Sequence, residues 1–138
     1  NLLNTIVQFL EDINYVGIMG IEMFDTKEGL VINEIAPRVH NSGHYTSTAC
    51  SLSQFEAHLL AGTQSEIPQI YHDPYFAMVN LLGKSTRTPK VPQNLTGDLH
   101  WYGKTENRPR RKMGHVSLGG DRGNVLNILL KERKEIKL

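Results

Sequence analysis

The segment from Asn33 to His44 gathers side chains that can do chemistry at the end of a predicted strand. It holds a carboxylate, a guanidinium, two imidazoles, two carboxamides and a hydroxyl within twelve residues. Groups at the end of a rigid strand are held in place better than groups on a free loop, and binding sites are often built there. The segment therefore predicts the rim of an active site.

A second acidic residue, Glu22, lies on the strand that precedes this segment. Residues 16–24 and 30–35 are apolar and rich in β-forming residues, and the turn between them ends in Gly29, which indicates a hairpin. If the turn is centred near Glu28, Glu22 and Glu34 pair across the strands and point to one face. The alternative that the spacing leaves open is a shift of register by one residue, which puts the two glutamates on opposite faces.

Two facing carboxylates repel each other unless a cation lies between them. Mg²⁺ is such a cation, because it takes one or two protein carboxylates together with the phosphates of a substrate. Glu22 and Glu34 are therefore candidate metal ligands. Asn33 and Glu34 are candidate nucleotide-binding residues.

Further polar residues follow Pro37, which ends the second strand. They are Arg38, His40, Asn41, Ser42 and His44. A guanidinium suits a carboxylate, a bicarbonate or a phosphate, and an imidazole suits proton transfer or donation to phosphate oxygens. The alternative is a loop whose side chains cap its own backbone, but the density of polar groups favours a binding site.

A basic run covers residues 108–115 and leads into an apolar strand. A nucleic-acid patch is one interpretation, and a solvated basic turn is another. The net charge of +1 gives no reason to expect nucleic acid as a partner. Arg111 and Lys112 are candidates for holding a single phosphate group beside Gly114.

The periodicities predict an α+β chain in two parts. Helices are expected at residues 1–13, at 53–61 with a capping box formed by Ser53 and Glu56, and at 124–136. Three short strands are expected at residues 76–82, 98–102 and 112–118, with a proline-containing loop around Pro89. We expect one domain at residues 1–66, with an antiparallel sheet and helices, and a small β-rich domain with a terminal helix at residues 67–138.

Composition sets the broad class of the protein. The 138 residues are 39% hydrophobic and 21% charged, as in ordinary globular proteins. The single cysteine, Cys50, excludes an internal disulfide and suits a reducing compartment. No membrane-spanning run or signal peptide is visible, so we expect a cytoplasmic protein with no membrane partner. The first residue is Asn1 rather than methionine, and we expect the chain to be the C-terminal part of a longer protein.

Three stretches of the chain carry a family resemblance. They are residues 20–24, residues 33–46 with the sequence NEIAPRVHNSGHYT, and residues 111–115 with the sequence RKMGH. Together with Ser53-Gln54-Phe55-Glu56 and His100-Trp101-Tyr102, they resemble the PurK-type ATP-grasp enzymes, the 5-(carboxyamino)imidazole ribonucleotide synthases. The resemblance runs from about Val16 to Leu118 and implies the C-terminal part of an ATP-grasp domain followed by a small C-terminal domain.

The resemblance also implies a reaction. Bicarbonate attacks the γ-phosphate of ATP to give carboxyphosphate, and 5-aminoimidazole ribonucleotide is then carboxylated in purine biosynthesis. Glu22 and Glu34 would bind Mg²⁺, with Asn33 assisting at the nucleotide. Arg38 would hold bicarbonate or carboxyphosphate, and Arg111 and Lys112 would bind the 5′-phosphate. The pocket for the ribonucleotide would be lined by His40, Asn41, Ser42 and His44.

Arg38, His44 and Lys112 are the residues for which the resemblance implies a catalytic role, and it implies a homodimer for the full-length enzyme. Arg110 departs from the family, because such enzymes usually carry glycine at this position, so the turn before Arg111 is expected to differ. The family's N-terminal domain and the lobe with the adenine-side lysine and glycine-rich loop are not in this sequence. We therefore expect no turnover of ATP by this chain alone.

Two other functions are compatible with the residues. One is another ATP-grasp ligase, such as a formate-dependent glycinamide ribonucleotide transformylase. The other is a module that binds a nucleotide or phosphate without catalysis.

Overall fold

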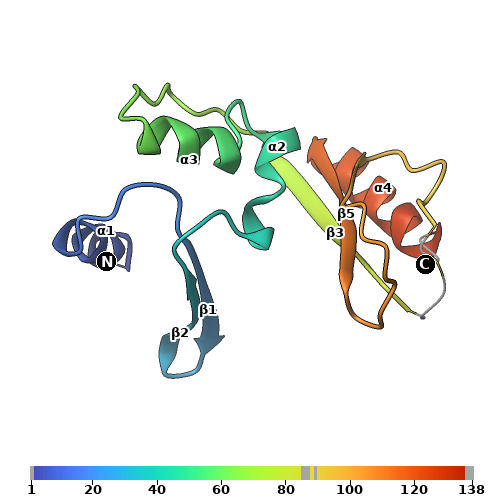
Figure 1. Ribbon diagram of the computed structural model, residues 1–138, viewed down its shortest axis with the longest axis horizontal. Coiled ribbons are helices and arrows are strands. Elements are labelled where there is room, and N and C mark those ends of the chain that lie inside the picture. The colour runs from blue at the N-terminus through green and yellow to red at the C-terminus, as the bar shows by residue number, and fades with distance from the viewer. Residues whose placement is uncertain (1, 85–87, 89, 136–138) are drawn as a thin grey trace. The chain divides into compact units, whose positions relative to one another are not determined.

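The computed structural model describes residues 2–84, 88 and 90–135, with the side chains of residues 132–135 excepted. Asn1, Pro89 and Ile136, which fall within predicted elements, lie outside the described residues. The chain folds into two compact units (Figure 1). Unit 1 comprises residues 1–43 and 54–69, and unit 2 comprises residues 44–53 and 70–138. The predicted domain boundary after residue 66 stays a prediction.

The mixed α+β class is confirmed, and both sheets are antiparallel. Unit 1 contains helix α1 (Leu2–Asp12), strands β1 (Gly20–Thr26) and β2 (Gly29–Ala36), the 3₁₀ turn η1 (Asn41–Gly43) and helix α3 (Gln54–Gly62). Unit 2 contains helix α2 (Thr46–Ala49), strands β3 (Tyr75–Leu82), β4 (Asp98–Trp101) and β5 (Lys112–Gly120), and helix α4 (Arg122–Glu135). None of the helices in the described residues has both the length and the hydrophobicity of a membrane-spanning segment.

Strand β1 begins at Gly20, whereas the sequence predicted a strand from Val16. The backbone of Ile18 forms hydrogen bonds with side chains instead of with a neighbouring strand. Its N–H donates to Nδ1 of His58 over 3.0 Å, and its carbonyl accepts from the Tyr15 hydroxyl over 2.8 Å. Gly17 adopts a φ of 123°, which only glycine reaches easily. The predicted early start of the strand is therefore wrong, because these contacts turn the chain before it enters the sheet.

The hairpin β1–β2 has the expected pairing and one irregularity. Gly29 closes the turn with a φ of 119°, and Glu22 pairs directly with Glu34. Met23 then pairs with Ile32, so that Asn33 is an extra residue in β2 opposite the step from Glu22 to Met23. Such a β-bulge redirects side chains locally and is common beside functional sites.

The apolar composition of the hairpin strands predicts that they are buried, but β1 is at most half-buried and β2 is exposed along its length except at Ala36. A groove of about 210 Å³ lies between α1 and the hairpin, and its lining includes Ile6, Phe9, Ile21 and Ile32. The apolar character of these strands thus marks a surface groove within unit 1.

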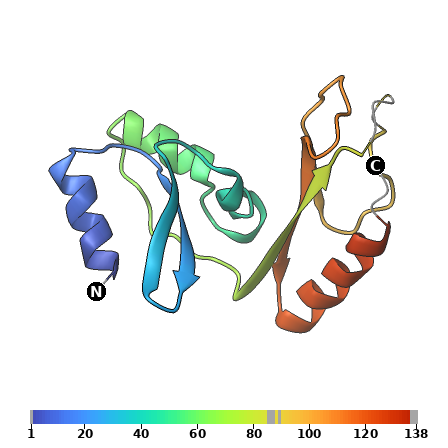
Figure 2. The same cartoon turned by 90° about the horizontal axis from the view of Figure 1, so that it is seen from below.

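Unit 2 is a three-stranded sheet in the order β3-β5-β4, with the central strand β5 buried along most of its length. Helix α4 runs along the sheet and contacts β3 and β5 (Figure 2). Side chains alternate between the two faces of a strand. Leu81, Val116 and Leu118 are buried apolar residues, and Val116 pairs with Val79 and Leu99. His115 and Ser117 alternate with them on β5, so the second face of the sheet carries polar side chains, with Met78 paired to Ser117.

Candidate functional site

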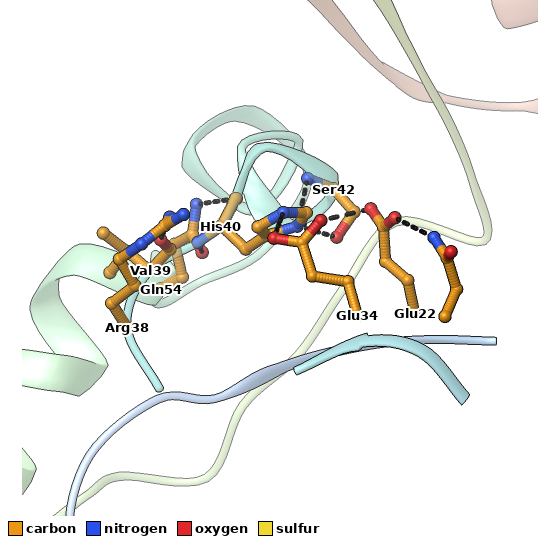
Figure 3. A network of polar contacts seen from close by, with 8 residues as sticks. Glu22, Glu34, Arg38, Val39, His40, Ser42 and Gln54 are labelled. Carbon is orange, nitrogen blue, oxygen red and sulfur yellow. Dashed lines mark hydrogen bonds and ion pairs between the residues drawn. The ribbon is translucent and has the colours of Figure 1, made fainter. Parts of the chain in front are cut away.

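The two glutamates of the hairpin meet at one histidine of unit 1. Oε1 of Glu22 lies 3.5 Å from Nδ1 of His40, and Oε1 of Glu34 lies 3.7 Å from Nε2 of the same ring. Nδ2 of Asn33 donates to Oε2 of Glu22 over 3.5 Å. Figure 3 shows both carboxylates turned toward the His40 ring. The structure therefore places the two acids on one face, as the direct pairing predicts, and the bulge brings Asn33 beside them.

The donor set of this group fits a hard divalent cation. Carboxylate and amide oxygens are the ligands that Mg²⁺ takes, and it needs only one or two carboxylates because substrate phosphates and water supply the rest. Glu22 and Glu34 are 40% and 49% exposed, so their oxygens are accessible. Among the described residues, no set of three or more His, Cys, Asp or Glu side chains is arranged to hold a metal. A site of this kind would therefore depend on the nucleotide for its remaining ligands.

His40 is itself fixed by a buried glutamine that starts α3. The His40 N–H donates to Oε1 of Gln54 and the His40 carbonyl accepts from Nε2 of Gln54, both over 2.9 Å. Gln54 is only 6% exposed. A Cβ atom at Gly20 would lie 2.7 Å from Cβ of His40, so glycine at this position lets the loop approach the hairpin. Gln54 thus ties the polar loop to α3.

We expect Gln54→Ala to lower the free energy of unfolding of this chain by about 2 kcal/mol, because two part-buried backbone groups of His40 lose their partner. Urea denaturation followed by circular dichroism measures the change. Gln8→Ala is the matched control: Gln8 makes one exposed hydrogen bond to Asp12 one helical turn away, and its loss should cost less than about 0.5 kcal/mol. Equal effects of the two substitutions would contradict the anchoring role of Gln54.

The other predicted loop residues of unit 1 are neighbours of His40 in the chain, and Ser42 contacts its ring. The hydroxyl oxygen of Ser42 lies 2.9 Å from Nδ1 of His40, and the Ser42 N–H donates to the same nitrogen over 3.4 Å. Asn41 is half-buried and begins η1. Arg38 is exposed, and its Nη1 donates to the carbonyl of Val39 over 2.9 Å. Glu22, Asn33, Glu34, His40 and Ser42 therefore form one contiguous polar cluster.

The remaining predicted residues lie in unit 2, where residues 108–111 of the basic run form a turn before β5. Glu106 accepts from two arginines through one oxygen, Oε2, which is 2.7 Å from Nη2 of Arg108 and 3.2 Å from Nη1 of Arg111. Lys112 is exposed at the first position of β5. One carboxylate thus draws two guanidinium groups together at the surface, and the trio keeps a net positive charge that suits a phosphate.

The turn at Arg110 has the backbone conformation that glycine favours, with a φ of 65°. Its N–H donates to the carbonyl of Gly83 and the Gly83 N–H donates to the carbonyl of Arg111, each over 2.8 Å. A Cβ atom at Gly83 would collide with the carbonyl of Arg108. The close approach of the two segments therefore holds residue 110 in the left-handed region even though it is an arginine.

We expect Arg110→Gly to raise the free energy of unfolding by up to about 1 kcal/mol. A side chain in the left-handed region costs about 1–2 kcal/mol, and the added freedom of glycine in the unfolded chain offsets part of the gain. Urea denaturation measures the change. Asn94→Gly is the control, because Asn94 has a φ of 60° but asparagine tolerates this region, so its gain should be smaller. A loss of stability on Arg110→Gly would contradict the strain at this position.

His44 belongs to a cluster of rings in unit 2. It stacks on His115 with ring centroids 4.8 Å apart, and His115 stacks on His100 at 4.7 Å. The Tyr102 hydroxyl lies 2.7 Å from Nδ1 of His115. Burial, and then the imidazoles of His44 and His100, lower the pKa of His115 from 6.5 to about 4, while burial raises the pKa of Tyr102.

This lowered pKa predicts how stability depends on pH. The unfolded chain takes up a proton at His115 near pH 6.5 and the folded chain only near pH 4. The unfolded state binds more protons between these values, so His115 makes the free energy of unfolding fall as the pH drops from about 6.5 to about 4. Urea denaturation across this range should show a smaller fall in His115→Phe. Ser117→Ala, a buried substitution that removes no titrating group, should keep the parent's slope of unfolding free energy against pH. An unchanged slope in His115→Phe would refute the assignment of this pH dependence to His115.

The sequence reasoning missed four residues that organise these groups. They are Gln54, Tyr102, Glu106 and His115. All except Glu106 lie in stretches that carry the family resemblance. Membership of these stretches is a signal that could have identified them as site residues. None has a short-range pattern that reveals its partner.

Comparisons with known proteins cover both units. The ATP-grasp domain family matches residues 2–55, and the phosphoribosylaminoimidazole carboxylase C-terminal domain family matches residues 77–128. The chain is 47% identical over 109 residues to N5-carboxyaminoimidazole ribonucleotide synthase of Escherichia coli, which covers 79% of this chain and 30% of that protein. It therefore spans about 30% of the length of this relative.

Solved structures agree with this match. The crystal structure of N5-carboxyaminoimidazole ribonucleotide synthetase from Thermotoga maritima is 42% identical, with a TM-score of 0.81 over 94% of this chain and 39% of that one. The Aspergillus clavatus enzyme, in complex with ADP and 5-aminoimidazole ribonucleotide, is 29% identical, with a TM-score of 0.70 over 87% of this chain and 35% of that one.

The matches follow one another along the chain in the order of the family: an ATP-grasp segment and then the family's C-terminal domain. The chain is thus a partial member of the N5-carboxyaminoimidazole ribonucleotide synthases, a PurK-type family of ATP-grasp ligases.

Proposed function

We propose that the full-length protein containing this chain carboxylates 5-aminoimidazole ribonucleotide with bicarbonate at the expense of ATP, in purine biosynthesis. The observation that carries the proposal is the pair of facing glutamates at His40, beside the bulged Asn33, in a chain whose relatives are synthases of this kind. The complex of the Aspergillus clavatus enzyme with ADP and 5-aminoimidazole ribonucleotide further supports the choice of substrates.

Glu22 and Glu34 would hold Mg²⁺ together with the phosphates of ATP, and Asn33 would orient Glu22 through its amide. Bound there, Mg²⁺ would neutralise negative charge on the phosphates and so favour transfer of the γ-phosphoryl group. The direct pairing and the bulge set the spacing of these side chains before the nucleotide binds. Such preorganisation lowers the reorganisation needed during phosphoryl transfer.

The other residues would act on bicarbonate and the ribonucleotide. A bicarbonate oxygen attacks the γ-phosphorus and ADP leaves; the amine of the ribonucleotide then attacks the carbon of carboxyphosphate, and phosphate leaves. The Arg38 guanidinium would hold the anionic bicarbonate and carboxyphosphate. The pocket for the ribonucleotide would comprise His40, Asn41, Ser42 and His44, and Arg111 and Lys112 would bind its 5′-phosphate. As proposed here, the catalytic groups are Arg38, His44 and Lys112.

The experiment measures ATP hydrolysis by the full-length protein. We expect 5-aminoimidazole ribonucleotide with bicarbonate to stimulate phosphate release, and glycinamide ribonucleotide with formate to have no effect. Stimulation by the second pair alone would identify another ATP-grasp ligase. If ATP is hydrolysed with neither pair of substrates, the remaining interpretation is a module that binds a nucleotide or phosphate without catalysis. Both results would refute the proposal.

The isolated chain should bind phosphate ligands without turning over ATP, since it spans only about 30% of its relative from Escherichia coli. A homodimeric state and a cytoplasmic location of the full-length protein also belong to the proposal. Sedimentation of the full-length protein at several concentrations tests the first, and fractionation of cells tests the second.

A further inference from the structure

The sheet of unit 2 places His115 at the centre of a polar row. His100 on β4 pairs with His115 on β5, and His115 pairs with Asn80 on β3. Residues that pair directly point to the same face of the sheet. The row therefore lies on the second face of the sheet, away from Val116 and Leu118, which alternate with His115 on β5.

His44 reaches this row from the chain that leads into α2. Its ring stacks on His115 with an interplanar angle of 15°, and the ring of His100 stacks on His115 at 16°. His115 is thus the shared partner of two imidazoles that come from different elements.

The His115 ring is itself held by the Tyr102 hydroxyl at Nδ1, over 2.7 Å. This bond stops the ring from turning about its Cβ–Cγ axis, whichever nitrogen carries the proton. His115 is only 4% exposed, and its Nε2 has no hydrogen-bond partner among the described residues. A ring so enclosed does not reach a bound ligand directly, and it can affect one only through a neighbour.

We propose that His115 is a positioning residue, which Tyr102 fixes and which in turn sets the orientation of the His44 imidazole. The inference rests on the proposed function for its consequence, because His44 belongs to the ribonucleotide pocket there. The low pKa of His115 agrees with this role, since a neutral ring avoids charge repulsion with the imidazoles on which it stacks.

The first experiment follows the His44 ring by nuclear magnetic resonance in the full-length protein with isotope-labelled histidine. We expect His115→Leu to shift and broaden the ring signals of His44, because the stacking partner is lost. Tyr102→Phe should give a smaller shift in the same direction. The control is His72→Gln, an exposed histidine outside the stack, which should leave these signals in place. Unchanged His44 signals in His115→Leu would overturn the inference.

The second experiment is a double-mutant cycle on kcat/KM for 5-aminoimidazole ribonucleotide. We expect Tyr102→Phe to lower this value up to about ten-fold, as for one lost hydrogen bond, and to leave the KM for ATP unchanged. In a His44→Ala background, Tyr102→Phe should have no further effect. Full additivity of the two losses would show that Tyr102 and His115 act independently of His44, and would refute the inference.

The two experiments separate this inference from the proposed function. If His44→Ala leaves kcat/KM unchanged while His115→Leu still moves the His44 signals, the place of His44 in the ribonucleotide pocket is wrong and the positioning by His115 stands. Melting temperatures of all variants show whether each variant is still folded.

Discussion

Glu34→Gln should lower kcat of the full-length protein at least about 100-fold, as loss of one preorganised electrostatic contact in a transition state typically does. The substitution keeps the shape of the side chain but removes one of the two facing charges that the cation would need. Binding of 5-aminoimidazole ribonucleotide should stay within a few-fold of the parent, because the proposed role of Glu34 is to hold the metal and not the ribonucleotide. Steady-state phosphate release and calorimetric titration with the ribonucleotide measure the two effects.

Glu28→Gln is the matched control for this result. Glu28 lies in the exposed turn of the same hairpin, at the end away from His40. The Glu28→Gln substitution changes the net charge by the same amount as Glu34→Gln, yet it should leave kcat unchanged. If both variants turn over at the parent rate, Glu34 has no part in catalysis and the metal site is wrong. If both lose activity alike, the effect comes from general charge or folding.

Arg111→Ala should raise the KM for 5-aminoimidazole ribonucleotide between about ten-fold and about 100-fold. A hydrogen bond between charged groups is worth about 1.5–3 kcal/mol, and 1.4 kcal/mol corresponds to a factor of ten. The KM for ATP should not change. Arg111→Lys should recover only part of the loss, because an ammonium group cannot form the two parallel bonds of a guanidinium. Initial rates at varied ribonucleotide concentration provide the measurement.

Arg122→Ala serves as the control for charge. Arg122 is an exposed arginine at the start of α4, away from the turn at Glu106. Its loss should leave both KM values unchanged. An Arg111→Ala enzyme with the parent KM for the ribonucleotide would show that its 5′-phosphate binds elsewhere.

The pairing of Glu22 with Glu34 was one of the two registers that the sequence left open, and the structure shows that local features select it. The turn length and Gly29 fix the register of the hairpin, and the register decides which face the glutamates share. The same local information does not predict the bulge at the next residue, Asn33, where the strand departs from simple alternation of its side chains. Nothing in the alternation of residues 30–35 marks the extra residue, since a bulge depends on how two strands meet.

The other features that the sequence did not predict depend on contacts between segments that are distant along the chain. The start of β1 is set by His58, forty residues further along the chain. Gln54 holds His40 from the next helix, and His115 meets His44 from the last strand. Each of these side chains has an ordinary role in its own helix or strand, so its own sequence neighbourhood does not reveal its partner.

The most direct test of the central claim is formation of the carboxylated ribonucleotide by the full-length protein. Radiolabelled bicarbonate, ATP and 5-aminoimidazole ribonucleotide are incubated together, and the product is separated without acid, because carbamates lose carbon dioxide in acid. We predict label in the ribonucleotide that requires ATP and is lost in Glu34→Gln but kept in Glu28→Gln. Hydrolysis of ATP without label in the ribonucleotide, or equal labelling in both variants, would contradict the account.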